Sequence, residues 1–188
     1  YLWDGDGAAE VDLRGVSIQG DGKIVACGER SITGNFGDRY ALLVRFLSNG
    51  QLDSSFGGSG YVTVGSSGTD FVGVHVQFTG RIMALQWSPE IIRAYRQSDG
   101  AVDTSFGSAG HVDLPFIGYY GQFLAMYGDD RLLACGSAVN GGSYAVRVSA
   151  NGGIDSSFLS GGTDRLPIGW TEDVLGVHAK TCAPSLDG

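Results

Sequence analysis

The residues of this chain best placed to do chemistry are three aspartates that recur at regular intervals. Each stands in a similar string, LDSSFG, VDTSFG or IDSSFL, with a serine two positions later. The three are Asp53, Asp103 and Asp155. A calcium loop gathers several oxygen ligands, whereas one carboxylate recurs here beside serine and glycine. We therefore predict that each carboxylate accepts hydrogen bonds from nearby backbone N–H groups in an Asx turn.

A second set of candidate calcium ligands lies near the start of the sequence. Asp4 and Asp6 give the D-x-D-G opening of a calcium loop. The later acidic ligand that an EF-hand requires does not follow at the expected spacing. We interpret this segment as a turn, and we expect neither a metal nor another cofactor.

Histidines do not form a catalytic or metal-binding pattern. His75, His111 and His178 have no H-x-H or H-x-x-x-H spacing, and no G-x-S-x-G, P-loop or C-x-x-C motif is present. His75 and His178 share a repeat position that Ala125 fills in another unit. Because alanine is accepted there, we expect no essential base at this position and no catalytic residue in the chain.

The three cysteines raise the question of a disulfide or a metal site. Cys27 and Cys135 share a repeat position that the second unit fills with Leu85. A position that accepts leucine is apolar and buried, so we predict free thiols that act as small hydrophobic groups. Equivalent positions two units apart should also exceed the roughly 6 Å Cα separation of a disulfide. We expect no Cys27–Cys135 bridge, and Cys182 lies in the less regular tail.

Arg45 and Arg147 share a repeat position from which each could pair with the aspartate of its own unit. The second unit keeps Asp103 but aligns Tyr95 with the two arginines. We therefore predict that the aspartate does not depend on this arginine. The expected role of the arginine is to lie as a long side chain over a sheet face.

These residues belong to an internal repeat of about fifty residues, and such a period is typical of propellers and solenoids. Each copy begins with two apolar runs around a polar turn, which predicts a β-hairpin. A third strand then runs into an Asn-Gly or Asp-Gly turn, and a fourth strand follows. The predicted hairpins span 15–28, 73–86 and 123–136, the third-strand segments 40–50, 90–100 and 142–152, and the fourth strands 61–64, 111–114 and 163–166.

The repeat predicts an all-β protein, with 1–188 as one repeat domain. We expect a β-propeller of about three and a half four-stranded blades, with the first strand of each blade nearest the axis. The blade-like units are about 11–64, 69–115 and 120–168, followed by an incomplete fourth unit at 172–188. A β-trefoil, which also has three four-stranded units, is the alternative fold.

One phenylalanine recurs in each unit, directly before or close to a glycine. The three are Phe56, Phe106 and Phe158. The third unit keeps the ring although Leu159 replaces the glycine that follows it in the others. The ring is therefore the more constant feature, and we predict that all three rings are buried between neighbouring units.

The repeat resembles the delta-60 repeat family of bacterial surface and secreted proteins. The matching residues are DGKIVA at 21–26 with Gly28, Ala41-Leu42 with Arg45, Asn49-Gly50, and LDSSFG at 52–57. The resemblance implies a β-propeller with one unit per blade, an extracellular or cell-surface location and no catalytic residues. The second unit departs from the family pattern, with Phe-Thr-Gly at 78–80 in its first turn.

Charge and hydropathy exclude several kinds of partner. The sequence has 20 acidic and 12 basic residues, a net charge of −8 and no basic cluster. Nucleic-acid binding needs Lys and Arg to neutralise phosphates, so we expect no DNA or RNA partner. No run of eighteen apolar residues exists, so we expect no membrane span.

We therefore expect a non-enzymatic binding or scaffold module with a protein or glycan ligand. The second possibility is a carbohydrate-binding propeller, in which exposed aromatic side chains stack on sugar rings; the candidates are Trp87, Trp170, Tyr119 and Tyr120. The third is a propeller hydrolase or lyase. Three and a half blades leave open faces, because propellers typically need four or more. We expect further blades or further copies of the chain to complete the ring.

Overall fold

The computed structural model describes residues 10–33, 38–66, 68–114, 120–137, 143–158 and 163–165. Several predicted features lie outside these residues: Asp4, Asp6, Tyr119, Trp170, His178, Cys182 and the incomplete unit at 172–188. Tyr120 is described only through its backbone.

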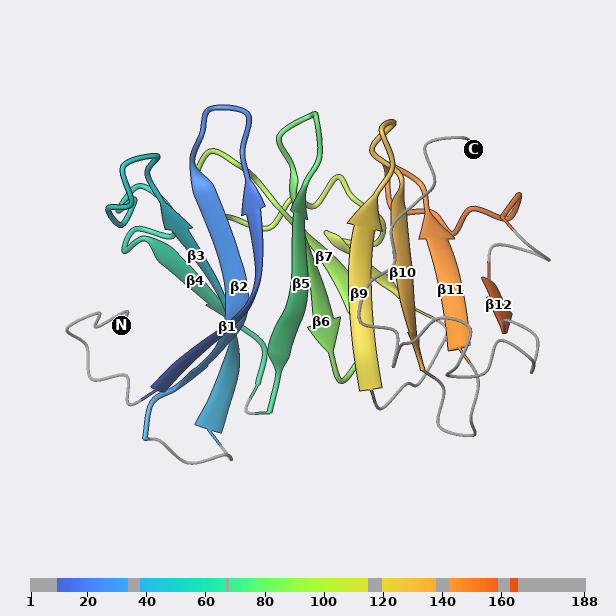
Figure 1. Ribbon diagram of the computed structural model, residues 1–188, viewed down its shortest axis with the longest axis horizontal. Helices are drawn as coiled ribbons and strands as arrows, with labels where there is room; N and C mark the ends of the chain where they lie inside the picture. Colours follow the sequence, from blue (N-terminus) through green and yellow to red (C-terminus); the bar gives the residue numbers. More distant parts are fainter. Residues whose placement is uncertain are drawn as a thin grey trace.

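The described residues form three four-stranded antiparallel sheets, and each strand pairs with the next one along the chain (Figure 1). The first sheet contains β1 (Glu10–Ile18), β2 (Ile24–Ser31), β3 (Arg39–Phe46) and β4 (Tyr61–Val64). The second contains β5 (Asp70–Val76), β6 (Ile82–Trp87), β7 (Ile91–Tyr95) and β8 (His111–Asp113). The third contains β9 (Tyr120–Met126), β10 (Leu132–Ser137), β11 (Ser143–Val148) and β12 (Thr163–Arg165). The expected all-β class is confirmed.

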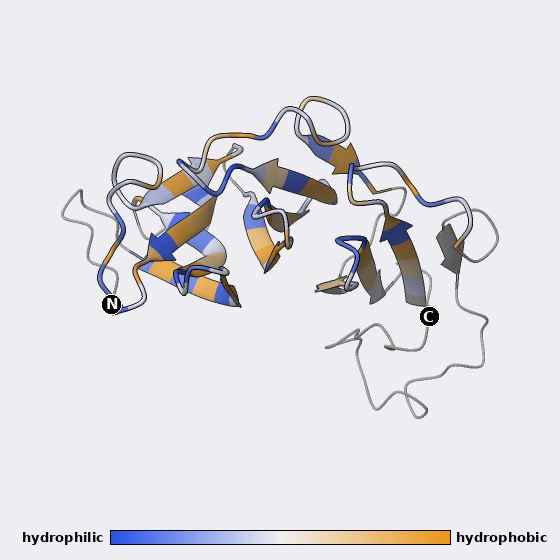
Figure 2. Cartoon of the chain, turned by 90° about the horizontal axis from the view of Figure 1, so that it is seen from above, coloured by the Kyte–Doolittle hydropathy of each residue, from blue (hydrophilic) through white to orange (hydrophobic). Residues whose placement is uncertain are grey.

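The first strands of the three sheets lie side by side, with β1 against β5 and β5 against β9. Viewed from above, the sheets follow one another along an arc that the described residues leave open (Figure 2). This radial order is the one expected of a β-propeller. The barrel and cap of hairpins that define a β-trefoil are not found in the described part of the chain. Among these residues, no helix is long and apolar enough to cross a membrane.

A β-bulge brings the first strands close together. The pairing register of β1 with β2 shifts between Leu13 and Gly15, and β5 shifts against β6 at the equivalent place. A Cβ atom on Gly15 would lie 2.9 Å from the Cys27 sulfur and 3.3 Å from the Val74 backbone nitrogen. Glycine at this point therefore allows β1 and β5 to approach each other.

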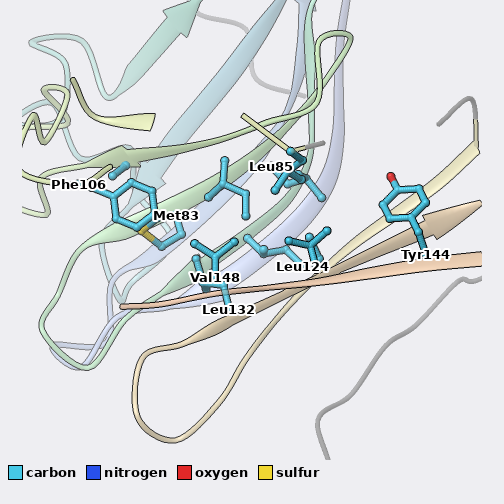
Figure 3. Packing of buried hydrophobic residues seen from close by; sticks show 12 residues of the cluster. Met83, Leu85, Phe106, Leu124, Leu132, Tyr144 and Val148 are labelled. Atoms are coloured by element: carbon cyan, nitrogen blue, oxygen red, sulfur yellow. The ribbon is translucent and has the colours of Figure 1, made fainter. Parts of the chain in front are cut away.

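Strand β6 shows why the apolar runs of this sequence are continuous. Side chains alternate between the two faces of a strand. Ile82 and Ala84 pack against the first sheet, whereas Met83 and Leu85 pack toward the third. The central sheet is thus covered on both faces. Figure 3 shows the cluster between the second and third sheets, in which Met83 and Phe106 lie near residues of β9, β10 and β11.

Two of the three recurrent phenylalanines are completely buried, as predicted. Phe56 and Phe106 have no exposed surface. Phe158 is only partly buried and packs against a small cluster on the outer face of the third sheet. Its prediction is confirmed in part, because no following sheet covers that face among the described residues.

The cysteine predictions have a mixed outcome. Cys27 is a free and fully buried thiol, and burial raises its pKa to about 12. Cys135 is disulfide-bonded, so the expectation of a free thiol there is wrong. Burial alone was a poor criterion, because a disulfide sulfur is as compatible with an apolar position as a thiol. Since Cys27 is free, the predicted absence of a Cys27–Cys135 bridge is confirmed.

Candidate functional site: a latch between neighbouring sheets

The recurrent aspartate organises the loop that follows the third strand of each sheet. In the first sheet, Asp53 Oδ1 accepts hydrogen bonds from the Ser55 backbone N–H at 3.2 Å and from the Ser55 hydroxyl at 2.6 Å. The same pair of bonds is repeated at Asp103 (3.1 and 2.6 Å) and at Asp155 (3.0 and 2.6 Å). The predicted Asx turns are confirmed.

The other carboxylate oxygen binds an arginine, which contradicts the prediction that the aspartate is independent of it. Arg45 Nε lies 2.9 Å from Asp53 Oδ2, and Arg45 Nη2 donates to the Ser55 hydroxyl at 3.1 Å. The guanidinium carbon is 4.5 Å from the centre of the Phe56 ring. In the third sheet, the Nε of Arg147 lies 2.8 Å from its aspartate, in the same arrangement.

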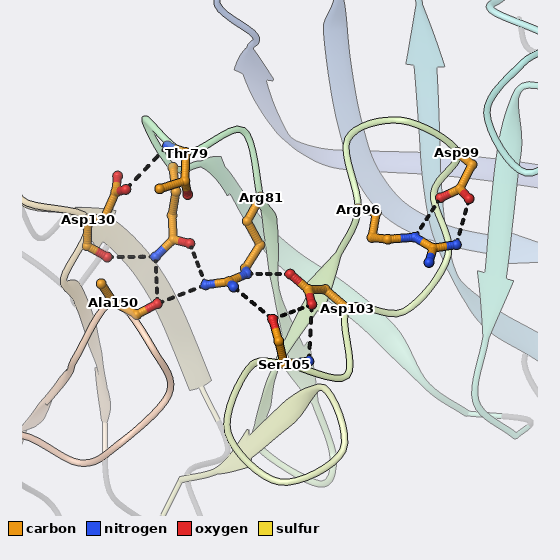
Figure 4. A network of polar contacts seen from close by, with 9 residues as sticks. Thr79, Arg81, Arg96, Asp99, Asp103, Ser105, Asp130 and Ala150 are labelled. Atoms are coloured by element: carbon orange, nitrogen blue, oxygen red, sulfur yellow. Dashed lines mark hydrogen bonds and ion pairs between the residues drawn. The ribbon is translucent and has the colours of Figure 1, made fainter.

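The second sheet has the same arrangement, with an arginine from a different position in the sheet. Arg81, directly before β6, places Nε 2.6 Å from Asp103 Oδ2 and donates from Nη2 to Ser105 at 3.1 Å (Figure 4). Its guanidinium carbon is 5.6 Å from the centre of the Phe106 ring. A guanidinium therefore bridges the aspartate and serine and lies over the phenylalanine in all three sheets.

Strand pairing explains why the sequence alignment misplaced this arginine. Ala94 pairs with Met83 as Arg45 pairs with Val25, so Ala94, and not Tyr95, stands at the arginine position. The turn after β7 is one residue longer than its counterparts: Gly100 N bonds to Arg96 O, whereas Gly50 N bonds to Leu47 O. The small Ala94 side chain leaves room for the guanidinium of Arg81.

The first and third sheets place a second cation near the carboxylate, from the position equivalent to Arg81. Lys23 Nζ is 3.1 Å from Asp53 Oδ2, and Arg131 Nη1 is 3.6 Å from Asp155 Oδ2. Asp53 and Asp155 can thus each be neutralised by a cation directly before the second strand of the sheet and by an arginine within the third strand. Among the described residues, Asp103 is paired only from the first of these positions, where Arg81 stands in place of the first sheet's lysine.

Hydrogen bonds keep these carboxylates ionised. The Ser55 hydroxyl, with a smaller contribution from Lys23, holds the pKa of Asp53 well below its usual range. The Ser105 hydroxyl and then Arg81 lower the pKa of Asp103 to about 2. The Ser157 hydroxyl does the same for Asp155, whose pKa is also about 2. Permanently charged, hydrogen-bonded carboxylates are suited to structure and poorly suited to proton transfer near neutral pH.

The guanidinium also reaches the next sheet along the chain. Arg45 donates from Nη1 to the carbonyl of Gln97 and from Nη2 to that of Ser98 at 3.5 Å. Arg81 Nη1 donates to the carbonyl of Ala150 at 3.0 Å. These carbonyls lie in the turn after the third strand of the following sheet.

Backbone and ring contacts complete this junction. Gly57 N donates to Asp99 O, and Gly107 N donates to Asn151 O, each at 2.9 Å. A Cβ on Gly100 would lie 2.8 Å from the Phe56 ring, so glycine is required there for contact as well as for its φ of +76°. We call each Arg, Asp, Ser and Phe set a latch, and we call the turn that it meets a receiving turn. The latches are Arg45–Asp53–Ser55–Phe56, Arg81–Asp103–Ser105–Phe106 and Arg147–Asp155–Ser157–Phe158. The receiving turns of the first two latches are 96–100 and 149–152, and the turn at 47–50 is their equivalent in the first sheet.

A further clasp joins the second and third sheets and was missed in the sequence. Asp130 accepts hydrogen bonds from the backbone N–H groups of Phe78 at 2.6 Å and Thr79 at 3.3 Å. Its φ is +67°, where the other two units have glycine. The side-chain amide of Gln77 also donates a hydrogen bond to the backbone carbonyl of Asp130 at 2.7 Å. The only sequence signal was that Asp130 stands where the other two units have Gly22 and Gly80.

A charged cluster between the first two sheets was also missed. Arg14, the extra residue of the β1 bulge, contacts the carboxylates of Asp70 and Glu29. Arg39 contacts Glu29 as well. Burial raises the pKa of Asp70, although Arg14 opposes that shift.

The predicted ligand-binding aromatic residues are not assembled into a site by the described residues. Trp87 ends β6, is partly buried and pairs with Asp70 across the strands. Tyr120 begins β9. Within the described ranges, no group of three or more His, Cys, Asp or Glu side chains could hold a metal ion. His75 lies in β5, where burial lowers its pKa, and His111 lies in β8.

One comparison with known protein families supports a propeller-like repeat. Residues 19–56, within the first sheet, match the family described as a domain of unknown function (DUF5122) beta-propeller. This supports a β-propeller-like repeat, while the delta-60 name stays a prediction. No match was found among curated proteins.

Two solved structures are similar to this chain at low identity. One is a virginiamycin B lyase from Staphylococcus aureus, with 12% identity and a TM-score of 0.48, covering 87% of this chain and 57% of the other. The other is a mutant of the GH43 protein BlXynB from Bacillus licheniformis, with 13% identity and a TM-score of 0.47, covering 82% and 29%. This chain therefore spans under two thirds of either protein.

Proposed function

We propose that this chain is a non-enzymatic β-propeller module that serves for binding or as a scaffold in a bacterial secreted or surface protein. The proposal includes a delta-60 type repeat with blades at about 11–64, 69–115 and 120–168 and a fourth, incomplete blade at 172–188. One observation carries it: in the first two sheets, the recurrent Arg, Asp, Ser and Phe side chains hold one sheet against the next. The residues that recur in every unit therefore hold the sheets together, and we assign ligand binding to residues that differ between units.

Phe78 is the strongest candidate for such a binding residue. It is 78% exposed in the turn between β5 and β6, where the other units have Gly20 and Gly128. Loops at the end of a sheet stack are the usual place for recognition, and an exposed ring offers apolar contact area at low entropic cost. The ligand that we propose is a protein or a glycan, and no nucleic acid.

A second candidate function, hydrolase or lyase, is favoured by the Asp70 carboxylate. Its Oδ1 is buried without a hydrogen-bond partner among the described residues, and its pKa is raised. A carboxyl group of this kind can act as a general acid. Trp87 is its cross-strand neighbour and could hold a sugar ring there, as the carbohydrate-binding alternative requires.

A paired assay separates these functions. The chain is incubated with virginiamycin B and with a set of aryl glycosides, and it is also applied to a glycan array beside Phe78→Ala and Trp87→Ala. We expect no turnover. Turnover by the wild-type chain that Asp70→Asn abolishes would overturn the non-enzymatic proposal, and glycan binding lost in Trp87→Ala but kept in Phe78→Ala would establish the carbohydrate-binding alternative.

A further inference from the structure

The side-chain amide of Gln77 is fully hydrogen-bonded at the junction between the second and third sheets. Its Nε2 donates to the carbonyl of Asp130 at 2.7 Å and to that of Ala150 at 3.2 Å. Its Oε1 accepts a hydrogen bond from Arg81 Nη1 at 3.2 Å. Gln77 is only 2% exposed, so this junction pairs both the donor and the acceptor of a buried amide with protein groups.

Gln19 occupies the equivalent place in the first sheet. Its backbone N–H donates to the carbonyl of Lys23 at 2.8 Å, as the N–H of Gln77 donates to the carbonyl of Arg81 at 2.9 Å. Gln19 is 3% exposed. However, neither its Nε2 nor its Oε1 has a hydrogen-bond partner among the described residues. The amide is therefore buried where β1 lies against β5, with its donor and its acceptor both unpaired by those residues.

The residue before the second strand explains why Oε1 has no partner. Arg81 has several nitrogens, and it uses Nε for Asp103 and Nη1 for the Gln77 oxygen. Lys23 stands at the same position but has a single side-chain nitrogen, which lies 3.1 Å from Asp53 Oδ2. The lysine therefore neutralises the aspartate of its own sheet and leaves the neighbouring amide oxygen unpaired.

The receiving turn explains why Nε2 has no partner. In the turn at 149–152, the Ala150 carbonyl accepts hydrogen bonds from both Gln77 and Arg81. The turn at 96–100 is one residue longer, and its Gln97 and Ser98 carbonyls accept from the guanidinium of Arg45. The first junction therefore lacks, among the described residues, a carbonyl in reach of the Gln19 amide.

Two further buried groups distinguish the first junction from the second. The Tyr95 hydroxyl and Asp70 Oδ1 are also without a hydrogen-bond partner among the described residues. Tyr95 belongs to the apolar cluster between the first and second sheets, and Asp70 contacts Arg14 of the first sheet. In the described part of the chain, no buried side-chain nitrogen or oxygen at the second junction lacks a partner. The first junction is thus the less completely paired of the two.

The unpaired atoms of Gln19 identify the chemical class of the missing partner. An anion would accept a hydrogen bond from Nε2 but would repel Oε1, and a cation would do the reverse. Water both donates and accepts, so it satisfies the two atoms together. Internal waters typically make about three hydrogen bonds to buried polar groups that have no other partner.

We infer that the junction between the first two sheets contains a binding site for internal water at the Gln19 amide. Water takes the place that Arg81 and the carbonyls of Asp130 and Ala150 take around Gln77. The same contact between sheets is thus mediated by water at the first junction and made directly between protein groups at the second. The inference concerns how the sheets are joined, and it goes beyond the proposed binding or scaffold function.

The first test uses the wild-type chain labelled with ¹⁵N. Rotating-frame NMR spectra distinguish a bound water from proton exchange with the solvent. We expect the side-chain amide protons of Gln19 to show a contact with a long-lived water molecule and those of Gln77 to show none. Gln19 amide protons without this contact, or the same contact at Gln77, would overturn the inference.

The second test counts long-lived waters by ¹⁷O magnetic relaxation dispersion in two matched variants. Methionine keeps the length of glutamine but has no amide. We expect Gln19→Met to lose at least one long-lived water and Gln77→Met to lose none. Equal counts in wild type and folded Gln19→Met would also contradict the site. If Gln19→Met does not fold, the wild-type NMR contact decides the question alone.

Discussion

At the scale of the residue, the guanidinium group occupies the same place beside the aspartate in every sheet, although the arginine that supplies it comes from different positions in the sequence. Arg45 and Arg147 reach the aspartate from the third strand, whereas Arg81 reaches it from the position directly before the second. Their Nε–Oδ2 and Nη2–Oγ contacts are the same in kind and close in length. The chemistry at the aspartate, serine and phenylalanine thus requires a planar, forked cation more than it requires a particular backbone origin.

Arg81→Ala should lower the free energy of unfolding by about 1 to 3 kcal/mol, because it leaves a partly buried carboxylate without its cationic partner. Restoring the first-sheet arrangement with Arg81→Lys and Ala94→Arg should recover most of that loss. Chemical denaturation measures both. Arg96→Ala removes an exposed pair with Asp99 and should change stability by less than about 0.5 kcal/mol. A double variant no more stable than Arg81→Ala would contradict the claim that an arginine at position 94 can replace the one at position 81.

The pH dependence follows from the lowered pKa of Asp103. Its folded pKa of about 2 lies below the usual unfolded value of about 3.9, so its contribution to stability is present above that value. It is lost as the pH falls from about 4 through 2. An NMR titration of the carboxyl group should give a midpoint near 2 in wild type and a higher one in Ser105→Ala. A midpoint near 4 in wild type would refute the assigned hydrogen bonds.

The sequence predicted the three Asx turns and the burial of Phe56 and Phe106, because the same string occurs three times; Phe158 is only partly buried. It could not predict Arg81, which lies 22 residues before Asp103 and directly before β6. The inserted residue in the turn after β7 also shifted the alignment, so that Tyr95 appeared to replace an arginine whose true counterpart is Ala94. Long-range pairing of this kind depends on strand register, which a single sequence does not specify.

At the scale of the element, the receiving turns connect local conformation with packing. An Asn-Gly or Asp-Gly turn needs a positive φ for its own geometry, and the sequence shows that much. The sequence does not show that a phenylalanine ring from the preceding sheet packs directly against the same glycine. A Cβ atom on Gly100 would lie 2.8 Å from the Phe56 ring, and one on Gly152 would lie 3.2 Å from the Phe106 ring.

Gly100→Ala should therefore be more destabilising than the backbone conformation alone explains. Strain at a left-handed position costs an alanine about 1 to 2 kcal/mol, and the new methyl group would also meet the Phe56 ring. Gly58→Ala, with φ of +77° and nothing within 4 Å, should show only the strain. The difference between their unfolding free energies measures the ring contact. Equal losses in the two variants would mean that the ring does not rest on the turn.

At the scale of the whole molecule, stability comes from three sheets that each cover the next. Two apolar clusters fill the spaces between them, and β6 contributes to both. The period of the repeat predicted the sheets and their radial order. It did not predict the β1 and β5 bulges or the cluster around Arg14, because a bulge adds one residue without changing the apolar pattern.

Cys27 provides a direct probe of the space between the first two sheets. The thiol is completely buried, and its raised pKa disfavours the reactive thiolate. A thiol reagent should therefore modify Cys27 only when these sheets separate, at a rate that rises with denaturant in parallel with unfolding. Cys27→Ser gives the background from the other cysteines. Rapid modification of Cys27 in native buffer would show that the first sheet is not held against the second.

The central claim is that the recurrent D-x-S-F loop is an inter-sheet latch and not a ligand surface. The free energy of unfolding of Phe106→Ala tests it most directly, since Phe106 is completely buried between the second and third sheets. We predict a loss of about 3 to 5 kcal/mol, as for other large-to-small changes in a core. A loss below about 1 kcal/mol, with a native-like circular dichroism spectrum, would show that the ring serves something other than packing.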